Sequence, residues 1–317
     1  MKTILVTGGA GFIGSNIVEY LILNTKYNVK VIDNLITGKI KNLEQFINDK
    51  YKDRFEFIYG DICDLEKVRR VMEGVDMITH QAALGSVPRS INDPLSSHKS
   101  NVNGFLNILI AANEKGIKKI VYASSSSVYG DENHLPKVEH KVGNVLSPYA
   151  ATKKIDEIYA NVFTRCYGME CIGLRYFNVF GPRQDPHGAY AAVIPKFINL
   201  MKNNKAPTIN GDGTFSRDFT YVENVVQANV KALETDNKLC YGEVYNIGAG
   251  GRVSLNELIN ILKKELNYEG SINYGKNRPG DIPHSNAEIM KARMHLEYEP
   301  KINFEEGIIK LLNHQII

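Results

Sequence analysis

The chain has 317 residues, of which 43% are hydrophobic, and its formal net charge at pH 7 is +3. This size and composition allow a large buried core, in one domain or in two modest ones. The small, evenly spread charge argues against a protein that binds nucleic acid or a membrane surface, and no apolar run is long enough to cross a membrane.

The first predicted strand, Lys2 to Val6, leads into a glycine-rich turn and an apolar helical run, Ile17 to Leu23. The turn reads Thr7-Gly-Gly-Ala-Gly-Phe-Ile-Gly14. It fits two glycine spacings, one that starts at Gly8 and one that starts at Gly9, and both continue through Gly11 and Gly14. Either spacing allows a tight turn and brings backbone close to a pyrophosphate at a helix N-terminus. The sequence therefore predicts a dinucleotide site.

Asp33 supports this site and selects the dinucleotide. It ends the second predicted strand, Val29 to Ile32, about 20 residues after the last glycine, which is the distance expected of a carboxylate that binds the adenosine ribose. A carboxylate there would repel a 2′-phosphate, and no arginine stands next to Asp33. We therefore expect NAD rather than NADP.

Further β-rich runs alternate with helical segments, as in a parallel sheet that helices cover on both faces. These runs are Phe55 to Tyr59, Met77 to Thr79, Lys119 to Ala123, Cys171 to Tyr176 and Val244 to Ile247. We predict an α/β protein with a Rossmann-type parallel sheet. Asp61, after the third strand, could reach the adenine amine, and the small residues of Gln81-Ala82-Ala83, after the fourth, allow close passage of the cofactor.

Tyr149 and Lys153 stand four residues apart, directly after Ser147-Pro148. Ser147 suits a helix N-cap and Pro148 the first helical position, so the helix places both side chains on one face, one turn apart. An ammonium beside a phenol stabilises the phenolate. Such a tyrosine could exchange protons with a hydroxyl near neutral pH.

The chain changes character from Phe180 onward, where glycine, proline and separate basic residues become frequent. We interpret this region as a smaller second domain interleaved with the last part of the sheet. The predicted Rossmann domain covers residues 1–178 and is completed by about 218–248. Residues 179–217 and 249–317 form the smaller, C-terminal substrate domain.

The chain resembles the extended short-chain dehydrogenases/reductases, and more narrowly the nucleotide-sugar 4-epimerases, over essentially its whole length. The motifs that carry the resemblance are the glycine turn, Ser124-Ser-Ser-Ser-Val-Tyr-Gly130, Ser147-Pro-Tyr-Ala-Ala-Thr-Lys153, Arg175-Tyr-Phe-Asn-Val-Phe-Gly-Pro182, Arg217-Asp-Phe219 and Arg278-Pro-Gly-Asp281. Three segments look most like those of UDP-N-acetylglucosamine 4-epimerases: Gly85-Ser-Val-Pro-Arg89, residues 184–195 and Pro283-His-Ser285.

The resemblance implies an NAD-dependent inversion at C4 of a UDP-hexose through a 4-keto sugar. Tyr149 would remove the proton of the 4-hydroxyl, Lys153 would hold the cofactor and support the phenolate, and Ser125 would hydrogen-bond the 4-oxygen. The cofactor residues that we expect are Gly8, Gly11, Phe12, Ile13, Gly14, Asp33, Asn34, Thr37, Gly38, Asp61, Ile62, Gln81, Ala82, Ala83, Asn101, Tyr149, Lys153 and Tyr176.

The smaller domain would bind the UDP-sugar. The resemblance implies that Arg217 and Arg278 contact the pyrophosphate, with Asn178 on the phosphate or sugar side and Asp281 on the uridine ribose. The other substrate residues that we expect are Ser86, Ser125, Ser126, Tyr149, Gln184, Val193, Asn210 and Ser285. Ser285 matches a bulky position of the galactose-only enzymes, so its small side chain leaves room for a 2-acetamido group and favours UDP-N-acetylglucosamine.

Other functions remain open at this stage. UDP-glucose could be the substrate, because a roomy pocket rejects a smaller substituent only weakly. A UDP-uronic acid 4-epimerase, for glucuronate or an N-acetylhexosaminuronate, or a decarboxylase would need a cation near C6, and Arg89 is the nearby candidate. A dehydratase would carry an Asp-Glu pair where this chain has Ser125-Ser126-Ser127. A non-catalytic NAD-sensing protein has no need of the Tyr149 and Lys153 pair.

The four cysteines and eight histidines show no metal-ligand spacing, so we predict no metal. The cysteines also lack a disulfide framework, which suits reduced thiols in a cytoplasmic protein. We expect no nucleic-acid or membrane partner. The resemblance implies a homodimer formed through two helices, Asn101 to Glu114 and Tyr149 to Phe163.

Overall fold

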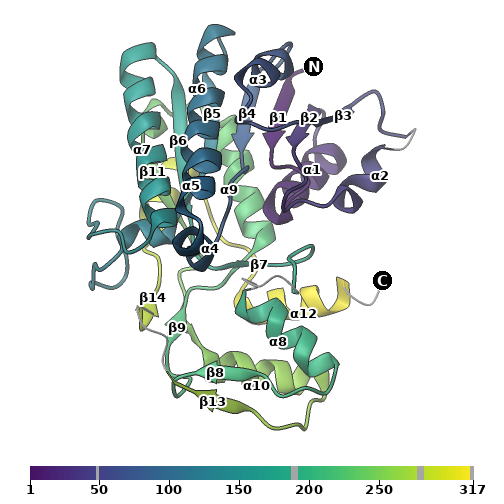
Figure 1. Cartoon of the computed structure of the whole chain (residues 1–317), viewed down its shortest axis with the longest axis vertical. Coiled ribbons are helices and arrows are strands. Elements are labelled where there is room, and N and C mark those ends of the chain that lie inside the picture. Colours follow the sequence, from purple (N-terminus) through teal and green to yellow (C-terminus); the bar gives the residue numbers. More distant parts are fainter. Residues whose placement is uncertain (48–49, 187–191, 277–281, 315–317) are drawn as a thin grey trace.

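The computed structural model describes residues 1–47, 50–186, 192–276 and 282–314. Its centre is a seven-stranded sheet in the order β11-β6-β5-β4-β1-β2-β3, with every neighbouring pair parallel (Figure 1). The strands are β1 (Thr3–Thr7), β2 (Asn28–Asp33), β3 (Phe55–Tyr59), β4 (Met77–His80), β5 (Lys119–Ser125), β6 (Glu170–Tyr176) and β11 (Val244–Ile247). The predicted fold class is confirmed.

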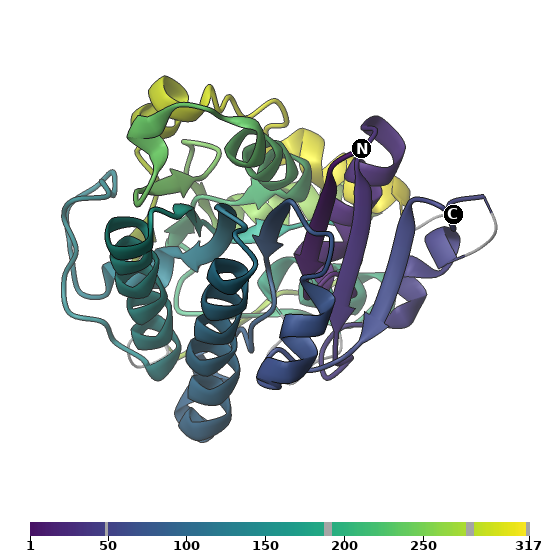
Figure 2. The ribbon, with the colours of Figure 1, turned by 90° about the horizontal axis from the view of Figure 1, so that it is seen from above.

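Helices cover both faces of this sheet, as the view from above shows (Figure 2). One face carries α1 (Phe12–Asn24), α2 (Glu44–Ile47), α9 (Val222–Glu234) and α11 (Met290–Leu296). The other face carries α3 (Leu65–Val71), α6 (Gly104–Glu114) and α7 (Pro148–Tyr167). Between β4 and α6 lie α4 (Val87–Asn92), α5 (Pro94–His98) and a π-helical turn (Lys99–Asn103). Short 3-10 helices cover Ile40–Leu43, Ser126–Tyr129 and Lys238–Cys240.

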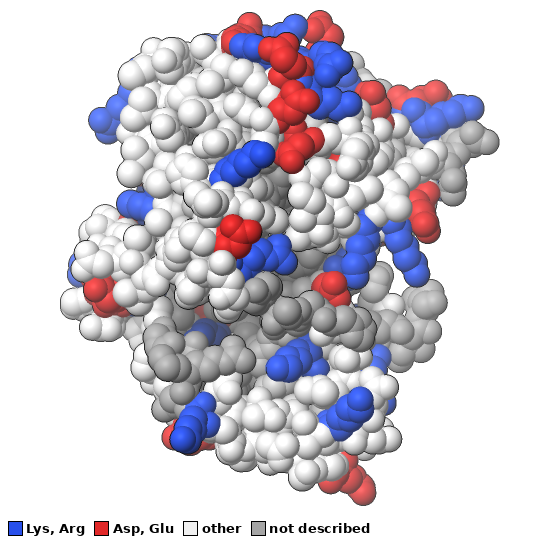
Figure 3. Space-filling model, in the orientation of Figure 1, with Lys and Arg blue, Asp and Glu red and all other residues white. Residues whose placement is uncertain are grey.

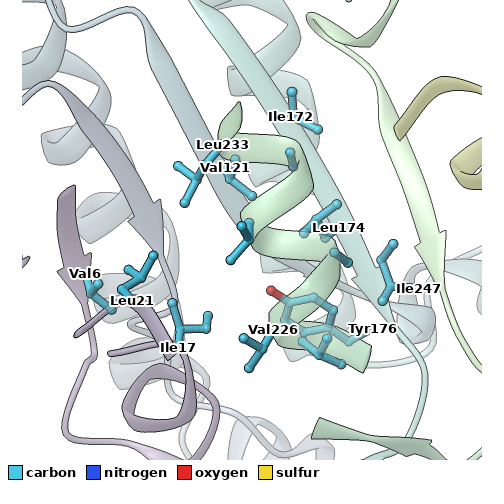
Figure 4. Packing of buried hydrophobic residues seen from close by; sticks show 14 of the residues in the cluster. Val6, Ile17, Leu21, Val121, Ile172, Leu174, Tyr176, Val226, Leu233 and Ile247 are labelled. Carbon is cyan, nitrogen blue, oxygen red and sulfur yellow. The ribbon is translucent and has the colours of Figure 1, made fainter. Parts of the chain in front are cut away.

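Apolar side chains from the strands fill the space between the sheet and each helix layer. On the face of α1 and α9, Val6 on β1 lies near Ile17 of α1, and Val121 on β5 lies beside Leu233 of α9 (Figure 4). Because neighbouring residues of a strand point to opposite faces, Leu5, Ile120 and Cys171 pack instead with α6 and α7. This two-sided burial explains why the strands read as nearly continuous apolar runs.

The smaller unit lies beyond the carboxyl ends of the strands and has its own core, which includes Phe197, Leu258 and Leu311. Its helices are α8 (Val193–Lys202), α10 (Leu255–Leu266) and α12 (Phe304–His314). Its strands pair as β7 (Val179–Phe180) with β10 (Thr220–Tyr221), β8 (Thr208–Asn210) with β13 (Asn273–Gly275), and β9 (Ser216–Arg217) with both β12 (Val253–Ser254) and β14 (His284–Ser285).

One segment does not follow the predicted division of the chain. Residues 287–298, which the sequence assigned to the smaller domain, place Ala287, Ala292 and Tyr298 in the core between the sheet and α9. The domain boundaries otherwise stay a prediction. The predicted homodimer also stays a prediction, although α7 exposes Ile158 and Val162.

Charged side chains of both signs are spread over the face shown in Figure 3. Within the described part of the chain, no helix combines the length and apolar character that crossing a membrane requires.

Candidate active site

The glycine turn between β1 and α1 requires glycine at two positions. Gly8 has a φ of 67°, and a Cβ there would lie 2.7 Å from the backbone of Ala82. A Cβ at Gly14 would lie 2.2 Å from the carbonyl oxygen of Gly8. Gly11 is the N-cap of α1 and has no side chain to bond the first N–H groups of the helix. The cradle is therefore shaped for a phosphate group to approach the backbone, and it fits the predicted NAD.

Asp33 lies at the end of β2, beside this turn. Its carboxylate accepts hydrogen bonds from the N–H groups of Ala10 (3.0 Å) and Leu35 (2.8 Å). Burial raises the pKa of Asp33 above its ordinary value, against these two hydrogen bonds. A Cβ at Gly38 would lie 2.9 Å from both carboxylate oxygens. Gly38 therefore contributes by letting the chain pass close to Asp33.

These features line one pocket at the carboxyl edge of the sheet. It lies where the strand order reverses between β1 and β4, the usual ligand site of such sheets. The predicted cofactor residues that line it are Gly8, Gly11, Phe12, Ile13, Gly14, Asp33, Asn34, Thr37, Ile62, Gln81, Ala82, Ala83, Tyr149, Lys153 and Tyr176. The pocket brings Tyr149 and Lys153 together with the glycine turn.

Three predicted cofactor residues, Gly38, Asp61 and Asn101, do not line this pocket. Asp61 accepts hydrogen bonds from Asn34 Nδ2 (3.2 Å) and the N–H of Cys63 (2.8 Å). Burial raises the pKa of Asp61, but these hydrogen bonds outweigh it, so the pKa lies below its ordinary value. Asn101 is fully buried, and its amide bonds both the N–H (2.7 Å) and the carbonyl (3.3 Å) of Leu84, which lines the pocket.

The helix that carries the catalytic pair begins as predicted. Pro148 is the first residue of α7, and Ser147 Oγ accepts a hydrogen bond from the N–H of Ala150 at 3.1 Å. The N–H of Tyr149 donates to Ser90 Oγ (2.9 Å), and its carbonyl accepts from Thr152 Oγ1 (2.8 Å). The backbone of Tyr149 is therefore held on both sides.

Lys153 is almost fully buried below the pocket. Its Nζ donates to the carbonyl of Ala123 (2.8 Å) and to Asp156 Oδ2 (3.3 Å). His80 is also buried, with Nδ1 2.8 Å from Thr7 Oγ1. Burial, reinforced by the Lys153 charge, lowers the pKa of His80 to about 3. His80 is therefore neutral, and Lys153 supplies the positive charge here.

The serines at the end of β5 differ in their contacts and in whether they line the pocket. Ser124 lines the pocket, but its hydroxyl donates to Glu157 Oε1 (2.7 Å). Ser125 Oγ accepts from the N–H of Ser127 (3.2 Å) and from Ser127 Oγ (2.9 Å), and Ser126 begins the next turn. Neither Ser125 nor Ser126 lines the pocket in this form, so their contact with a substrate stays a prediction.

Three predicted substrate residues gather where the smaller unit meets the sheet. Ser285 on β14 pairs with Arg217 on β9, and Arg217 Nη1 bonds the carbonyls of Ser216 and Pro283, each at 3.0 Å. Asn178 Nδ2 donates to the carbonyl of Asp218 at 3.2 Å. Strand pairing, rather than nearness in sequence, brings Asn178, Arg217 and Ser285 together.

The remaining predicted substrate residues are spread around these groups. Ser86 is the N-cap of α4, with a φ of 112°. Gln184 Nε2 donates to the carbonyl of Val179 (3.2 Å), while its buried Oε1 has no partner among the described residues. Val193 begins α8 and Asn210 ends β8. Arg278 and Asp281 lie outside the described residues.

Among the described residues, no group of three or more His, Cys, Asp or Glu side chains is arranged to hold a metal ion. The predicted lack of a metal stays a prediction.

Sequence reasoning missed the buried groups that support the catalytic pair. Ser90 follows the Gly85–Arg89 segment directly, and Asp156 stands three residues after Lys153, on the same side of α7. The helical spacing could have indicated Asp156. No local pattern could have indicated Ser90, because it meets Tyr149 across 59 residues of sequence.

The family model described as "NAD dependent epimerase/dehydratase family" matches residues 4–248 of the chain. Among curated proteins, a putative UDP-glucose 4-epimerase of Methanocaldococcus jannaschii is 43% identical over 312 residues, covering 98% of this chain and 97% of that protein.

Two solved structures are similar over nearly the whole chain. A UDP-glucose 4-epimerase of Thermotoga maritima with UDP-glucose has a TM-score of 0.91 and 37% identity, covering 99% of this chain and 98% of that one. A UDP-N-acetylglucosamine 4-epimerase of Methanobrevibacter ruminantium in complex with UDP-N-acetylmuramic acid has a TM-score of 0.92 and 39% identity, with the same coverage.

Proposed function

The chain belongs to the NAD dependent epimerase/dehydratase family, and we propose that within it the protein interconverts UDP-N-acetylglucosamine and UDP-N-acetylgalactosamine by inverting C4. One observation carries the proposal: Tyr149 and Lys153 line the same pocket as the glycine turn and Asp33. A proton-transfer group and a dinucleotide site in one pocket suit the oxidation and re-reduction of a secondary alcohol.

Bound NAD would supply the hydride acceptor, and then the hydride donor, for C4. Asp33 would hold the adenosine ribose, and the N-terminus of α1 would hold the pyrophosphate. The buried Lys153 leaves one ammonium hydrogen for the nicotinamide ribose, because Ala123 and Asp156 accept the other two.

Tyr149 is the proposed base and acid. Its phenolate oxygen would take the proton of the 4-hydroxyl and return it to the 4-oxygen when the hydride comes back to the opposite face of C4. The ammonium of Lys153 stabilises the phenolate. Ser125 would donate its own hydroxyl hydrogen to the 4-oxygen, because Ser125 is the acceptor in its bond with Ser127.

The UDP group would bind at the smaller unit. Arg217, together with Arg278, would pair with the pyrophosphate, for which guanidinium groups are well shaped. Asn178 lies beside Arg217 in the described structure, and Asp281 would take the uridine ribose. With the nucleotide bound there, the sugar would extend toward Tyr149.

Ser285 supports the choice of an N-acetylated sugar. It pairs with Arg217, so its hydroxymethyl group stands next to the proposed pyrophosphate site. A serine leaves room for the 2-acetamido group when the keto sugar turns its other face to the cofactor. The similarity to the M. ruminantium UDP-N-acetylglucosamine 4-epimerase also supports this choice.

The test is a proton NMR time course with UDP-N-acetylglucosamine and, in parallel, UDP-glucose, without added cofactor. We expect anomeric signals of UDP-N-acetylgalactosamine to appear faster than those of UDP-galactose. Conversion of UDP-glucose alone would contradict the choice of substrate and keep the 4-epimerase. If neither sugar changes even with NAD supplied, the proposal fails and a UDP-uronic acid becomes the substrate to test, with Arg89 as the cation beside its carboxylate.

A further inference from the structure

A carboxylate lies buried directly below the catalytic pair. Asp156 is 1% exposed and Lys153 is 2% exposed, and Asp156 Oδ2 is 3.3 Å from Lys153 Nζ. The second oxygen, Oδ1, is buried without a hydrogen-bond partner among the described residues. A buried carboxylate with an unpaired oxygen destabilises the folded protein more than an apolar residue of similar size would. Stability alone therefore does not explain Asp156.

The charged and titratable groups around Asp156 come from four elements. On α7 these are Lys153 and Glu157, and on β5 the phenol of Tyr122 faces the carboxylate. His80 on β4 faces Lys153 and is neutral. Arg175 on β6 forms two hydrogen bonds to Glu157 and neutralises it. Among the described residues, Lys153 is the cation that faces the Asp156 carboxylate.

Asp156 can change its charge under ordinary conditions. Burial raises the pKa of Asp156 to about 7, against the Lys153 ammonium, which lowers it. Once ionised, the carboxylate offsets part of the positive charge that Lys153 presents to the pocket.

We propose that Asp156 is a positioning residue that acts through Lys153. Its carboxylate fixes the ammonium against the carbonyl of Ala123 and sets how much positive charge reaches the phenol of Tyr149. The inference rests on the proposed roles of Tyr149 and Lys153, but neither of its readouts needs turnover of a sugar. A failure here is therefore distinguishable from a failure of the proposed function.

Two variants separate the two parts of the role. Asp156→Asn keeps an oxygen that can accept from Lys153 and removes the charge. Asp156→Leu removes both at similar volume. Asp236→Asn is the matched control, because it removes one carboxylate from an exposed loop. The first readout is the pH midpoint of phenolate absorbance in the full-length protein with NAD. For each variant, the absorbance of the same variant carrying Tyr149→Phe is subtracted, which removes the signal of the other tyrosines.

We expect Asp156→Asn to move this midpoint to lower pH by about half a unit to one unit, because Lys153 then supports the phenolate with its full charge. Asp236→Asn leaves it in place. The second readout is the dissociation constant of NAD. Asp156→Leu should weaken binding about three- to tenfold, because NAD must then immobilise the Lys153 side chain itself, while Asp156→Asn stays within about twofold.

Each readout can overturn the proposal. A midpoint unchanged in Asp156→Asn would show that the carboxylate does not set the charge at the phenol. If Asp156→Leu folds and binds NAD as the wild type does, Asp156 does not hold Lys153. If Asp156→Leu does not fold, the midpoint of Asp156→Asn still decides whether Asp156 acts on the catalytic pair.

Discussion

Tyr149 is the residue whose chemistry can be removed with the least change to the fold. Among the described residues its two side-chain partners bond its backbone, with Ser90 on the N–H and Thr152 on the carbonyl. Replacement by phenylalanine leaves both in place and removes only the phenol oxygen. The effect of Tyr149→Phe therefore reports on proton transfer rather than on folding.

We predict that Tyr149→Phe lowers the rate of C4 inversion by about 10²- to 10⁴-fold, the usual contribution of a positioned acid or base. NMR turnover measures the rate, and thermal unfolding followed by circular dichroism checks the fold. Tyr167→Phe at the exposed end of the same helix is the matched control and should retain the wild-type rate. Wild-type turnover in Tyr149→Phe would exclude the phenol as the proton carrier.

Ser90 connects the α4 segment to the catalytic helix. It is fully buried, its Oγ donates to the carbonyl of Val87, and the same oxygen accepts the N–H of Tyr149. We predict that Ser90→Ala lowers kcat about tenfold with little change in KM, because an unpaired N–H at the start of α7 costs roughly 1 kcal/mol and loosens Tyr149.

The control for Ser90→Ala is Ser97→Ala. Ser97 is equally buried, but its hydroxyl donates to the carbonyl of Asp93, just ahead of its own helix. Equal losses of kcat in the two variants would mean that burial of a serine, and not its bond to Tyr149, matters.

Ser285 provides a test of substrate choice that carries its own control. We predict that Ser285→Tyr lowers turnover of UDP-N-acetylglucosamine at least tenfold more than that of UDP-glucose, because the aromatic ring fills the space of the acetamido group and leaves a plain hexose free to turn. The ratio of the two rates, measured in one NMR experiment, removes any general loss of activity. An unchanged ratio would mean that this position does not select the sugar.

At the scale of elements, one buried ion pair fastens α7 to the sheet. Arg175 on β6 forms two hydrogen bonds to the carboxylate of Glu157, at 2.7 Å and 2.9 Å, and a third to the carbonyl of Glu139. Ser124 Oγ also donates a hydrogen bond to the Glu157 carboxylate. The ends of β5 and β6 and the catalytic helix are thereby held in one register.

We predict that Glu157→Gln lowers the free energy of unfolding by about 3–5 kcal/mol, because it leaves the Arg175 charge buried without its partner. Urea unfolding followed by circular dichroism measures this change. Glu114→Gln breaks a pair of similar geometry, Arg69 with Glu114, on the exposed surface. It should lower the free energy of unfolding far less, because water screens an exposed ion pair. Similar losses in the two variants would mean that burial does not strengthen the Arg175 contact.

The strands of the main sheet could be predicted from sequence because burial on both faces makes each an uninterrupted apolar run. Phe55 to Tyr59 and Val244 to Ile247 have the predicted bounds, and the other strands differ by one or two residues at an end. The strands of the smaller unit could not be predicted in this way. Several contain two residues, such as Ser216–Arg217, which is too few for any alternation to show.

The residues of the candidate site likewise differ in whether a local sequence pattern could predict them. The glycine turn, Asp33 and the Tyr149–Lys153 helix are local patterns whose spacing carries their chemistry, and the structure brings all of them to one pocket. The contact of Ser90 with Tyr149 and the pairing of Ser285 with Arg217 join residues far apart in sequence. Only a fold can supply such contacts.

At the scale of the whole molecule, Asp218 joins the smaller unit to the sheet. It directly follows β9, and its carboxylate accepts the N–H groups of Ala249 (2.8 Å), Gly250 (3.1 Å) and Ala287 (3.2 Å). Ala249 and Gly250 lie just after β11, and Ala287 begins the segment that leads to α11. One buried side chain therefore holds three parts of the chain together beside Ser285.

This junction should make stability depend on pH. Burial raises the pKa of Asp218 from its ordinary 3.8 to about 6, against the three backbone hydrogen bonds. Because the folded pKa is the higher one, the folded state keeps the proton between pH about 4 and 6, where the unfolded chain releases it. The contribution of Asp218 to the free energy of unfolding is therefore largest below pH about 4. It falls as the pH rises to about 6 and stays constant at higher pH.

The shift corresponds to roughly 3 kcal/mol at about 1.4 kcal/mol per pH unit. Asp156 and Asp33 also have raised pKa values, so the wild-type slope alone cannot be assigned to Asp218. The difference in slope between the wild type and Asp218→Asn can be assigned to Asp218, because the other groups contribute equally to both proteins. The chain has no tryptophan, so urea unfolding is followed by circular dichroism. We expect the free energy of unfolding of the wild type to exceed that of Asp218→Asn most at pH about 4. This difference should shrink by roughly 3 kcal/mol by pH about 6.5. The corresponding difference between the wild type and the exposed Asp236→Asn should not change with pH. If the wild type and Asp218→Asn differ in free energy of unfolding by the same amount at both pH values, Asp218 is ionised throughout and joins the two units as a carboxylate.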